Sequence, residues 1–186
     1  MKSKILVAVR VRDGVVGPKT LKVLDNKLVV ASDPMVSHKK NVLRSKRSRE
    51  KQYAFDHAFG PSTKSTKVYE STTRFLIEGV LDGFNATVFA YGATGAGKTF
   101  TMLGTDTEPG IMVLTLRDLF SRVRSIESDP SSGIQYKITI SYLEVYNELI
   151  RDLLTPSGEF LDLREDPIKG PTVAGLSEVT TSSTDQ

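Results

Sequence analysis

One stretch of the sequence decides the fold: Gly92-Ala93-Thr94-Gly95-Ala96-Gly97-Lys98-Thr99 matches the spacing G-x-x-x-x-G-K-[ST] at every fixed position. Such a loop holds a chain of phosphates, because glycines at 92, 95 and 97 can take positive φ and let successive backbone N–H groups turn inward. Lys98 would reach the β- and γ-phosphates, and the Thr99 hydroxyl would bind a bridging Mg²⁺. The motif predicts nucleotide binding, but not what the nucleotide is used for.

The residues on either side of this stretch favour a phosphate loop over a helix that merely begins at Gly-Lys-Thr. Ala86 to Tyr91 are β-branched, aromatic or small, which predicts a buried strand that feeds the loop. A helix that starts behind the loop would add N–H donors and a favourable dipole. Strand, loop and helix therefore come in the required order.

The composition limits the other classes of function. The 186 residues, 39% of them hydrophobic, suffice for one domain or part of one. The absence of cysteine excludes a disulfide scaffold and a cysteine-ligated metal, and two histidines leave little for metal chemistry. No apolar run has membrane-spanning length and the N-terminus leads into a strand, so we expect a soluble intracellular protein.

Positive charge is concentrated in one place, although the net charge is only +3. Between residues 39 and 51 a single acid, Glu50, accompanies seven basic residues: Lys39, Lys40, Arg44, Lys46, Arg47, Arg49 and Lys51. Such a run is either a solvated loop or a surface for an anionic polymer, and the residues leave both interpretations open.

Hydrophobic periodicity predicts the remaining elements. In the first part we expect a buried strand at 5–9 extended by Arg10-Val11-Arg12, a hairpin of 21–24 with 28–30, a strand at 53–59, and a helix at 66–81 whose inner face carries Val68, Thr72, Phe75, Leu76 and Val80. In the second part we expect a helix at 112–128, a strand at 134–142, a short helix at 147–154, and a hairpin of 161–164 with 172–175.

Two long strings point to a known family. Residues 89–102 read FAYG-x-T-x-x-GKT-x-TM, and residues 141–154 read SYLE-x-YNE-x-x-RDLL. With these strings the chain resembles the kinesin motor domain from about Ile5 to its last residues. Three shorter stretches look most like the eighth kinesin class, whose members walk towards microtubule plus ends and often shorten them: Arg47 to Lys51, Met102 to Thr105 and Glu108 to Gly110.

The resemblance implies an α/β fold, a P-loop NTPase of kinesin type with a central mixed sheet and helices on both faces. Residues 1–186 would be the N-terminal part of a single motor domain, truncated before the switch regions. ATP and Mg²⁺ would be the cofactors. Arg10 and Arg12 match the R-x-R-P element along the adenine, Phe100 matches the aromatic position that stacks on it, and Asp13 stands where the family has proline.

The same resemblance implies microtubules as the partner and the cytoplasmic cytoskeleton as the location. The basic stretch 39–51 matches a loop that touches tubulin in depolymerising kinesins, and Lys169 falls in another tubulin-contacting loop. Tubulin is acidic, so these residues would steer association in a salt-dependent way. We expect a homodimer, formed through a coiled coil absent from this chain, and neither a membrane nor a nucleic-acid partner.

The family's switch motifs, N-x-x-S-S-R and D-x-x-G-x-E, are not present in the 186 residues. We therefore expect these residues alone to bind but not to hydrolyse ATP, and the strand at 86–91 to have unpaired edges. One alternative is a truncated, non-catalytic tubulin-binding fragment in which the basic loop matters. Another is a P-loop ATPase that depends on nucleic acid, which only the pI near 9.0 favours.

Overall fold

The computed structural model describes residues 5–12, 14, 20–32, 50–155, 158–168 and 170–183. The expectations for Asp13, for Lys169 and for residues 39–49 of the basic stretch lie outside these residues. The chain divides into two compact units, Met1–Leu119 and Phe120–Gln186, which are described separately. Helix α4 begins in the first unit and ends in the second.

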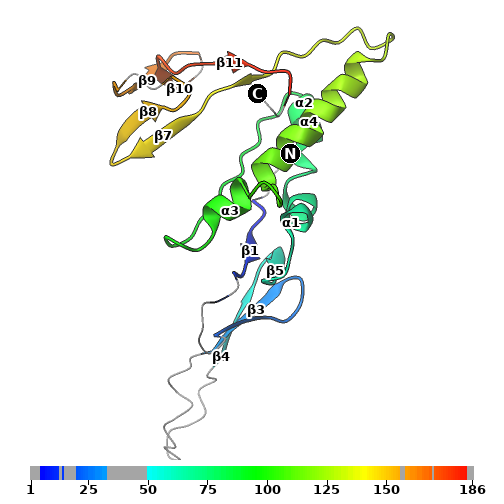
Figure 1. Cartoon of the computed structure of the whole chain (residues 1–186), viewed down its shortest axis with the longest axis vertical. Helices are drawn as coiled ribbons and strands as arrows, with labels where there is room; N and C mark the ends of the chain where they lie inside the picture. Colours follow the sequence, from blue (N-terminus) through cyan, green and yellow to red (C-terminus); the bar gives the residue numbers. More distant parts are fainter. Residues whose placement is uncertain are drawn as a thin grey trace, which may run out of the picture. The chain divides into compact units, whose positions relative to one another are not determined.

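The first unit begins with two small sheets (Figure 1). Strand β1 (Ala8–Arg10) pairs in parallel with β5 (His57–Phe59), while β2 (Leu21–Val23), β3 (Leu28–Ser32) and β4 (Glu50–Ala54) form an antiparallel sheet. The predicted β2–β3 hairpin is confirmed. Its turn is closed by the Asp25 carboxylate, which accepts the N–H groups of Lys27 and Leu28.

Two strand predictions in this unit need correction. The expected strand at 53–59 is divided between β4 and β5, because the backbone and carboxylate of Asp56 both bond to Val7 and turn the chain from one sheet to the other. The expected buried strand at 5–9 is shorter and less buried. Ile5 is 78% exposed, and β1 begins only at Ala8.

The helix expected at 66–81 is two helices, α1 (Ser65–Thr72) and α2 (Leu76–Leu81). The break follows a pair of β-branched residues, at which the Thr72 hydroxyl donates back to the Val68 carbonyl at 2.7 Å. The inner face therefore differs from the predicted one, since Phe75 is 54% exposed. The core of the unit consists of Phe59, Val68, Tyr69, Ile77 and Ile111.

Residues 86–91 do not form the predicted buried strand. No described strand pairs with this segment, and Phe89 and Tyr91 are 77% and 96% exposed. The prediction of a buried strand is wrong for this chain. Without a neighbouring strand the segment has neither ladder hydrogen bonds nor a packed face.

The two helices expected after the phosphate loop are present. α3 (Lys98–Met102) starts directly at the Gly-Lys-Thr end of the loop. After the loop 103–110, α4 (Ile111–Glu127) matches the helix predicted for 112–128 within one residue at each end. No helix in the described ranges combines the length and apolar character that a bilayer crossing requires.

The second unit contains three antiparallel strand pairs. β6 (Thr139–Ile140) pairs with β11 (Val179–Thr180), β7 (Leu143–Tyr146) with β8 (Leu149–Asp152), and β9 (Asp162–Asp166) with β10 (Gly170–Ala174). The predicted hairpin near 161–175 is thus confirmed as β9–β10.

Two predictions in this unit are wrong. The strand expected at 134–142 is reduced to β6, because strict alternation provides a face to bury but not the strand that pairs with it. The helix expected at 147–154 is instead the turn and second strand of the β7–β8 hairpin. Asn147 and Glu148 take φ of 51° and 66°, which suits a two-residue hairpin turn and prevents a helix from starting there.

Candidate nucleotide-binding site

The loop at residues 92–97 has the backbone that its glycines predict, with one difference. Gly95 and Gly97 have φ of 81° and 94°, and Gly97 is the left-handed residue from which α3 starts. Gly92 does not have positive φ. Glycine is needed there because Ala96 approaches closely: a Cβ on Gly92 would lie 3.1 Å from the Cβ of Ala96. Ala93, Thr94, Gly95 and Ala96 are exposed, so the loop is accessible to a ligand.

The side chain of Lys98 folds back over this loop. Its ammonium nitrogen donates to the carbonyl oxygen of Gly92 at 2.8 Å and to that of Ala93 at 3.1 Å. Thr99, the next residue of α3, is exposed. A compact cation and a hydroxyl therefore stand side by side at the end of a glycine loop, which is the donor set that a magnesium-bound polyphosphate needs.

The described residues fit a magnesium ion that arrives with the nucleotide rather than a pre-formed metal centre. No group of three or more His, Cys, Asp or Glu side chains that could hold a metal occurs among them. Mg²⁺ commonly keeps several waters and uses substrate phosphates with one or two protein oxygens. Thr99 fits that role.

Arg12 lies against the phosphate loop. Its guanidinium donates to the carbonyl oxygen of Gly95, and its Cδ lies 3.9 Å from the position that a Cβ on Gly97 would occupy. The side chain thus braces the two glycines with positive φ. Sequence reasoning placed Arg12 along the base, whereas its contact in this structure is to the loop.

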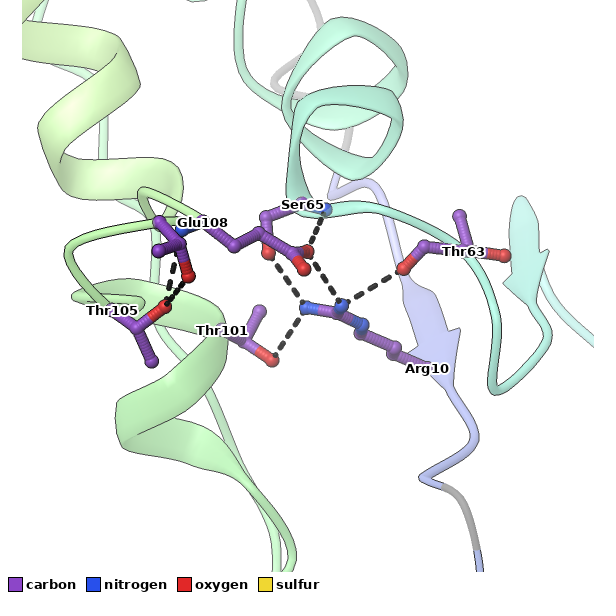
Figure 2. A network of polar contacts seen from close by, with 7 residues as sticks. Arg10, Thr63, Ser65, Thr101, Thr105 and Glu108 are labelled. Carbon is purple, nitrogen blue, oxygen red and sulfur yellow. Dashed lines mark hydrogen bonds and ion pairs between the residues drawn. The ribbon is translucent and has the colours of Figure 1, made fainter.

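Arg10 is the centre of a polar network that joins β1, α1, α3 and the loop 103–110 (Figure 2). One terminal nitrogen donates to the hydroxyls of Ser65 and Thr101 at 3.1 and 3.3 Å, and the other donates to the Thr63 carbonyl at 2.9 Å. The guanidinium carbon lies 5.0 Å from the ring centroid of Phe100, within range of a cation–π interaction. Arg10 and Phe100, both predicted site residues, are therefore in contact.

Glu108 also belongs to this network. From the sequence it was noted only as part of a stretch that resembles the eighth kinesin class. Its carboxylate lies 3.7 Å from the second terminal nitrogen of Arg10 and accepts the backbone N–H of Ser65 at 2.8 Å. The Ser65 N–H above all, together with the Ser65 side chain, Arg10 and Lys64, keeps the pKa of Glu108 below its ordinary value. Burial lowers the pKa of Arg10, and the charge of Glu108 opposes that shift.

The loop that carries Glu108 is closed by two glycines. Gly104 and Pro109 form a bridge, and Gly110 donates to the Leu103 carbonyl at 2.9 Å. A Cβ on Gly104 would lie 2.2 Å from the Glu108 carbonyl oxygen, and one on Gly110 would lie 2.4 Å from that of Met102. The backbone crossing between α3 and α4 therefore requires glycine on both sides.

Comparison with known proteins identifies similar chains. The family profile described as kinesin motor domain matches residues 18–186. The human kinesin-like protein KIF19 is 55% identical over 158 residues, which are 85% of this chain and 15% of that protein. The kinesin-like protein KIN-8B of Arabidopsis thaliana is 47% identical over 170 residues, which are 91% of this chain and 20% of that protein.

A solved structure is similar over the whole chain. It is described as a dimer of KIF14 residues 391–772 in the two-heads-bound state, with AMP-PNP and in complex with a microtubule. The TM-score is 0.84 at 30% identity, and the match covers 100% of this chain and 52% of that one.

The fold and the loop thus define an α/β protein of the P-loop NTPase class, as predicted. The chain belongs to the kinesin motor domain family. Relatives named KIN-8A and KIN-8B confirm the predicted resemblance to the eighth kinesin class. The chain spans only 15% to 20% of the length of KIF19 and KIN-8B.

Proposed function

We propose that these residues form the ATP-binding part of a microtubule-based motor that couples ATP hydrolysis to movement along microtubules. The motor assignment is supported by the family match, and the observation that carries ATP binding is the position of Lys98, whose ammonium lies over the carbonyl oxygens of Gly92 and Ala93 in an exposed glycine loop. A bound triphosphate would exchange these neutral acceptors for charged oxygens, which form stronger hydrogen bonds.

Each residue of the site has a role in this proposal. The backbone N–H groups of residues 92–97 hold the phosphates, Lys98 neutralises the β- and γ-phosphates, and Thr99 binds Mg²⁺. Phe100 provides a stacking surface for the base, with Arg10 over its ring, and Arg12 holds the phosphate loop through Gly95. The whole motor would catalyse hydrolysis by positioning and charge stabilisation, without a covalent intermediate.

Binding and turnover are separate parts of the proposal. Neither switch motif of the family is present in the 186 residues, so we expect these residues alone to bind Mg·ATP without measurable hydrolysis. In the whole protein we expect microtubules as the partner, a homodimeric assembly, and a location on the cytoskeleton. The KIF14 structure, a dimer in complex with a microtubule, supports these expectations.

The test is a titration of Mg·ATP into a folded preparation that includes this region, with Lys98→Ala as its variant. Saturable uptake that Lys98→Ala abolishes supports the proposal. Absence of uptake, or uptake that the variant leaves unchanged, contradicts it. Sedimentation with microtubules, with and without ATP, then separates a motor from a truncated tubulin-binding fragment. Microtubule binding that does not depend on nucleotide would favour the fragment.

A further inference from the structure

We propose that Glu108 is a positioning residue of the base-binding part of the site, because its contact with Arg10 fixes the cation that covers one face of Phe100. The inference rests on the proposed function, since it concerns the base of the same nucleotide. It assigns a role to a loop residue that lies outside the phosphate-binding motif.

The first step concerns the hydrogen-bonding capacity of Arg10. Its two terminal nitrogens face four acceptor groups, namely Ser65 Oγ, Thr101 Oγ1, the Thr63 carbonyl and the Glu108 carboxylate. Only 15% of its side chain is exposed. A guanidinium held in this way has a fixed orientation. Arg10 therefore acts on a base through the ring of Phe100 and not by donating a hydrogen bond to the base itself.

The second step concerns Phe100. Arg10 lies over its ring at 5.0 Å from the centroid, yet the residue remains 39% exposed. An aromatic side chain with one face against a cation and other surface open to solvent is suited to stack on a planar ligand. The orientation of the ring then depends on the orientation of the arginine.

The third step concerns how Glu108 is itself held. Its carboxylate accepts the N–H of Ser65 at the start of α1, and its own N–H donates to the Thr105 hydroxyl at 3.1 Å (Figure 2). The Thr105 N–H in turn donates to the Glu108 carbonyl at 2.8 Å. The backbone of Glu108 is thus held by Thr105 and its carboxylate by the Ser65 N–H, and together these contacts keep the carboxylate beside Arg10.

The charge of Glu108 is the part of the contact that matters. Ser65, Thr101 and Thr63 offer only neutral acceptors, and a largely buried guanidinium without a counter-charge is costly. Glu108→Gln retains an oxygen that can accept the Ser65 N–H, but it removes the negative charge that lies beside the Arg10 guanidinium. We expect Arg10 to leave its place over Phe100 in this variant.

The test compares two ligands, Mg·ATP and Mg·tripolyphosphate, which share the phosphates but not the base. In a folded preparation that includes this region, Glu108→Gln should weaken Mg·ATP binding about fivefold and leave Mg·tripolyphosphate binding unchanged. Arg10→Lys, which keeps the charge but loses the planar plate, should show the same selective loss. Isothermal titration of the unsubstituted protein and of each variant with each ligand gives the affinities to compare.

The control is Glu70→Gln, which removes an equivalent charge from the exposed pair of Glu70 with Lys67 on α1 and should change neither affinity. An equal loss for both ligands in Glu108→Gln, or no loss for Mg·ATP, overturns the inference. Lys98→Ala distinguishes this outcome from a failure of the proposed function. It should abolish the binding of both ligands, and if it changes neither, the nucleotide site itself is refuted.

Discussion

The ammonium nitrogen of Lys98 lies 2.8 Å from the carbonyl oxygen of Gly92, six residues earlier in the chain. This bond closes the phosphate loop on itself, with a second bond from the same nitrogen to Ala93. The lysine therefore has a structural contact in the free chain as well as its proposed contact with the nucleotide. The two contributions can be separated by measurement, because they differ in size.

We expect Lys98→Ala to lower the free energy of unfolding by only about 1 kcal/mol, since two hydrogen bonds to neutral carbonyls near the surface are lost and water replaces them. Nucleotide uptake, in contrast, should disappear. Denaturant unfolding of the two proteins without ligand measures the first effect. A destabilisation several times larger would mean that lost binding reports unfolding and not the removal of a phosphate contact.

A second prediction concerns the close backbone crossing between α3 and α4. Gly110→Ala should destabilise the protein by about 1–3 kcal/mol, because its Cβ would lie 2.4 Å from the Met102 carbonyl oxygen. Gly79→Ala is the matched control, since it lies within α2, and a Cβ there would meet nothing within 4 Å. That variant should stabilise the helix by roughly 0.5–1 kcal/mol. Thermal unfolding of both variants tests the contrast, and equal effects would contradict it.

Local signals in the sequence correctly placed much of this fold. The phosphate loop and the start of α3 follow from glycines and a lysine within eight residues. The β2–β3 hairpin follows from Asp25, whose carboxylate closes the turn through neighbours in the chain. In each case the groups that determine the structure lie close together in the sequence.

Several predictions were wrong, or incomplete, because the structure depends on groups far apart in the sequence. Residue type at 86–91 and alternation at 134–142 predicted strands, but pairing requires a partner strand, which neither pattern reveals. The network of Arg10 with Ser65 and Glu108 joins three distant segments. For that reason Glu108 could not be recognised as part of the site from its own neighbours.

A third prediction concerns the turn of the β7–β8 hairpin, which sequence reasoning assigned to a helix. Glu148 has φ of 66°, where a side chain is strained and glycine is not. Glu148→Gly should therefore stabilise the protein by about 0.5–1 kcal/mol, and Glu148→Val, with a β-branched side chain, should destabilise it by about 1 kcal/mol. Denaturant unfolding of both variants checks the order. The reverse order would indicate a helical turn at this position.

A fourth prediction concerns acid. Asp152, at the end of β8, is 8% exposed and accepts the N–H groups of Leu154, Thr155 and Ser177. These bonds, those from Ser177 first, lower its pKa from the ordinary value of 3.8 to about 2. Because the folded pKa lies below the unfolded one, the carboxylate stabilises the fold fully above pH 3.8 and loses this effect as the pH falls towards 2.

Asp152→Asn should therefore lower the melting temperature most at neutral pH, and the difference from the unsubstituted protein should shrink as the pH approaches about 2. An asparagine has one acceptor oxygen for donors that reach both oxygens of Asp152, so the Ser177 N–H or those of Leu154 and Thr155 would lose their partner. Asp162→Asn is the control, since that side chain is 74% exposed and forms an exposed ion pair with Arg164, and its effect should be small at every pH. A difference for Asp152→Asn that stays constant from neutral pH down to about 2 would show that the substitution acts through shape and not through the charge of the carboxylate.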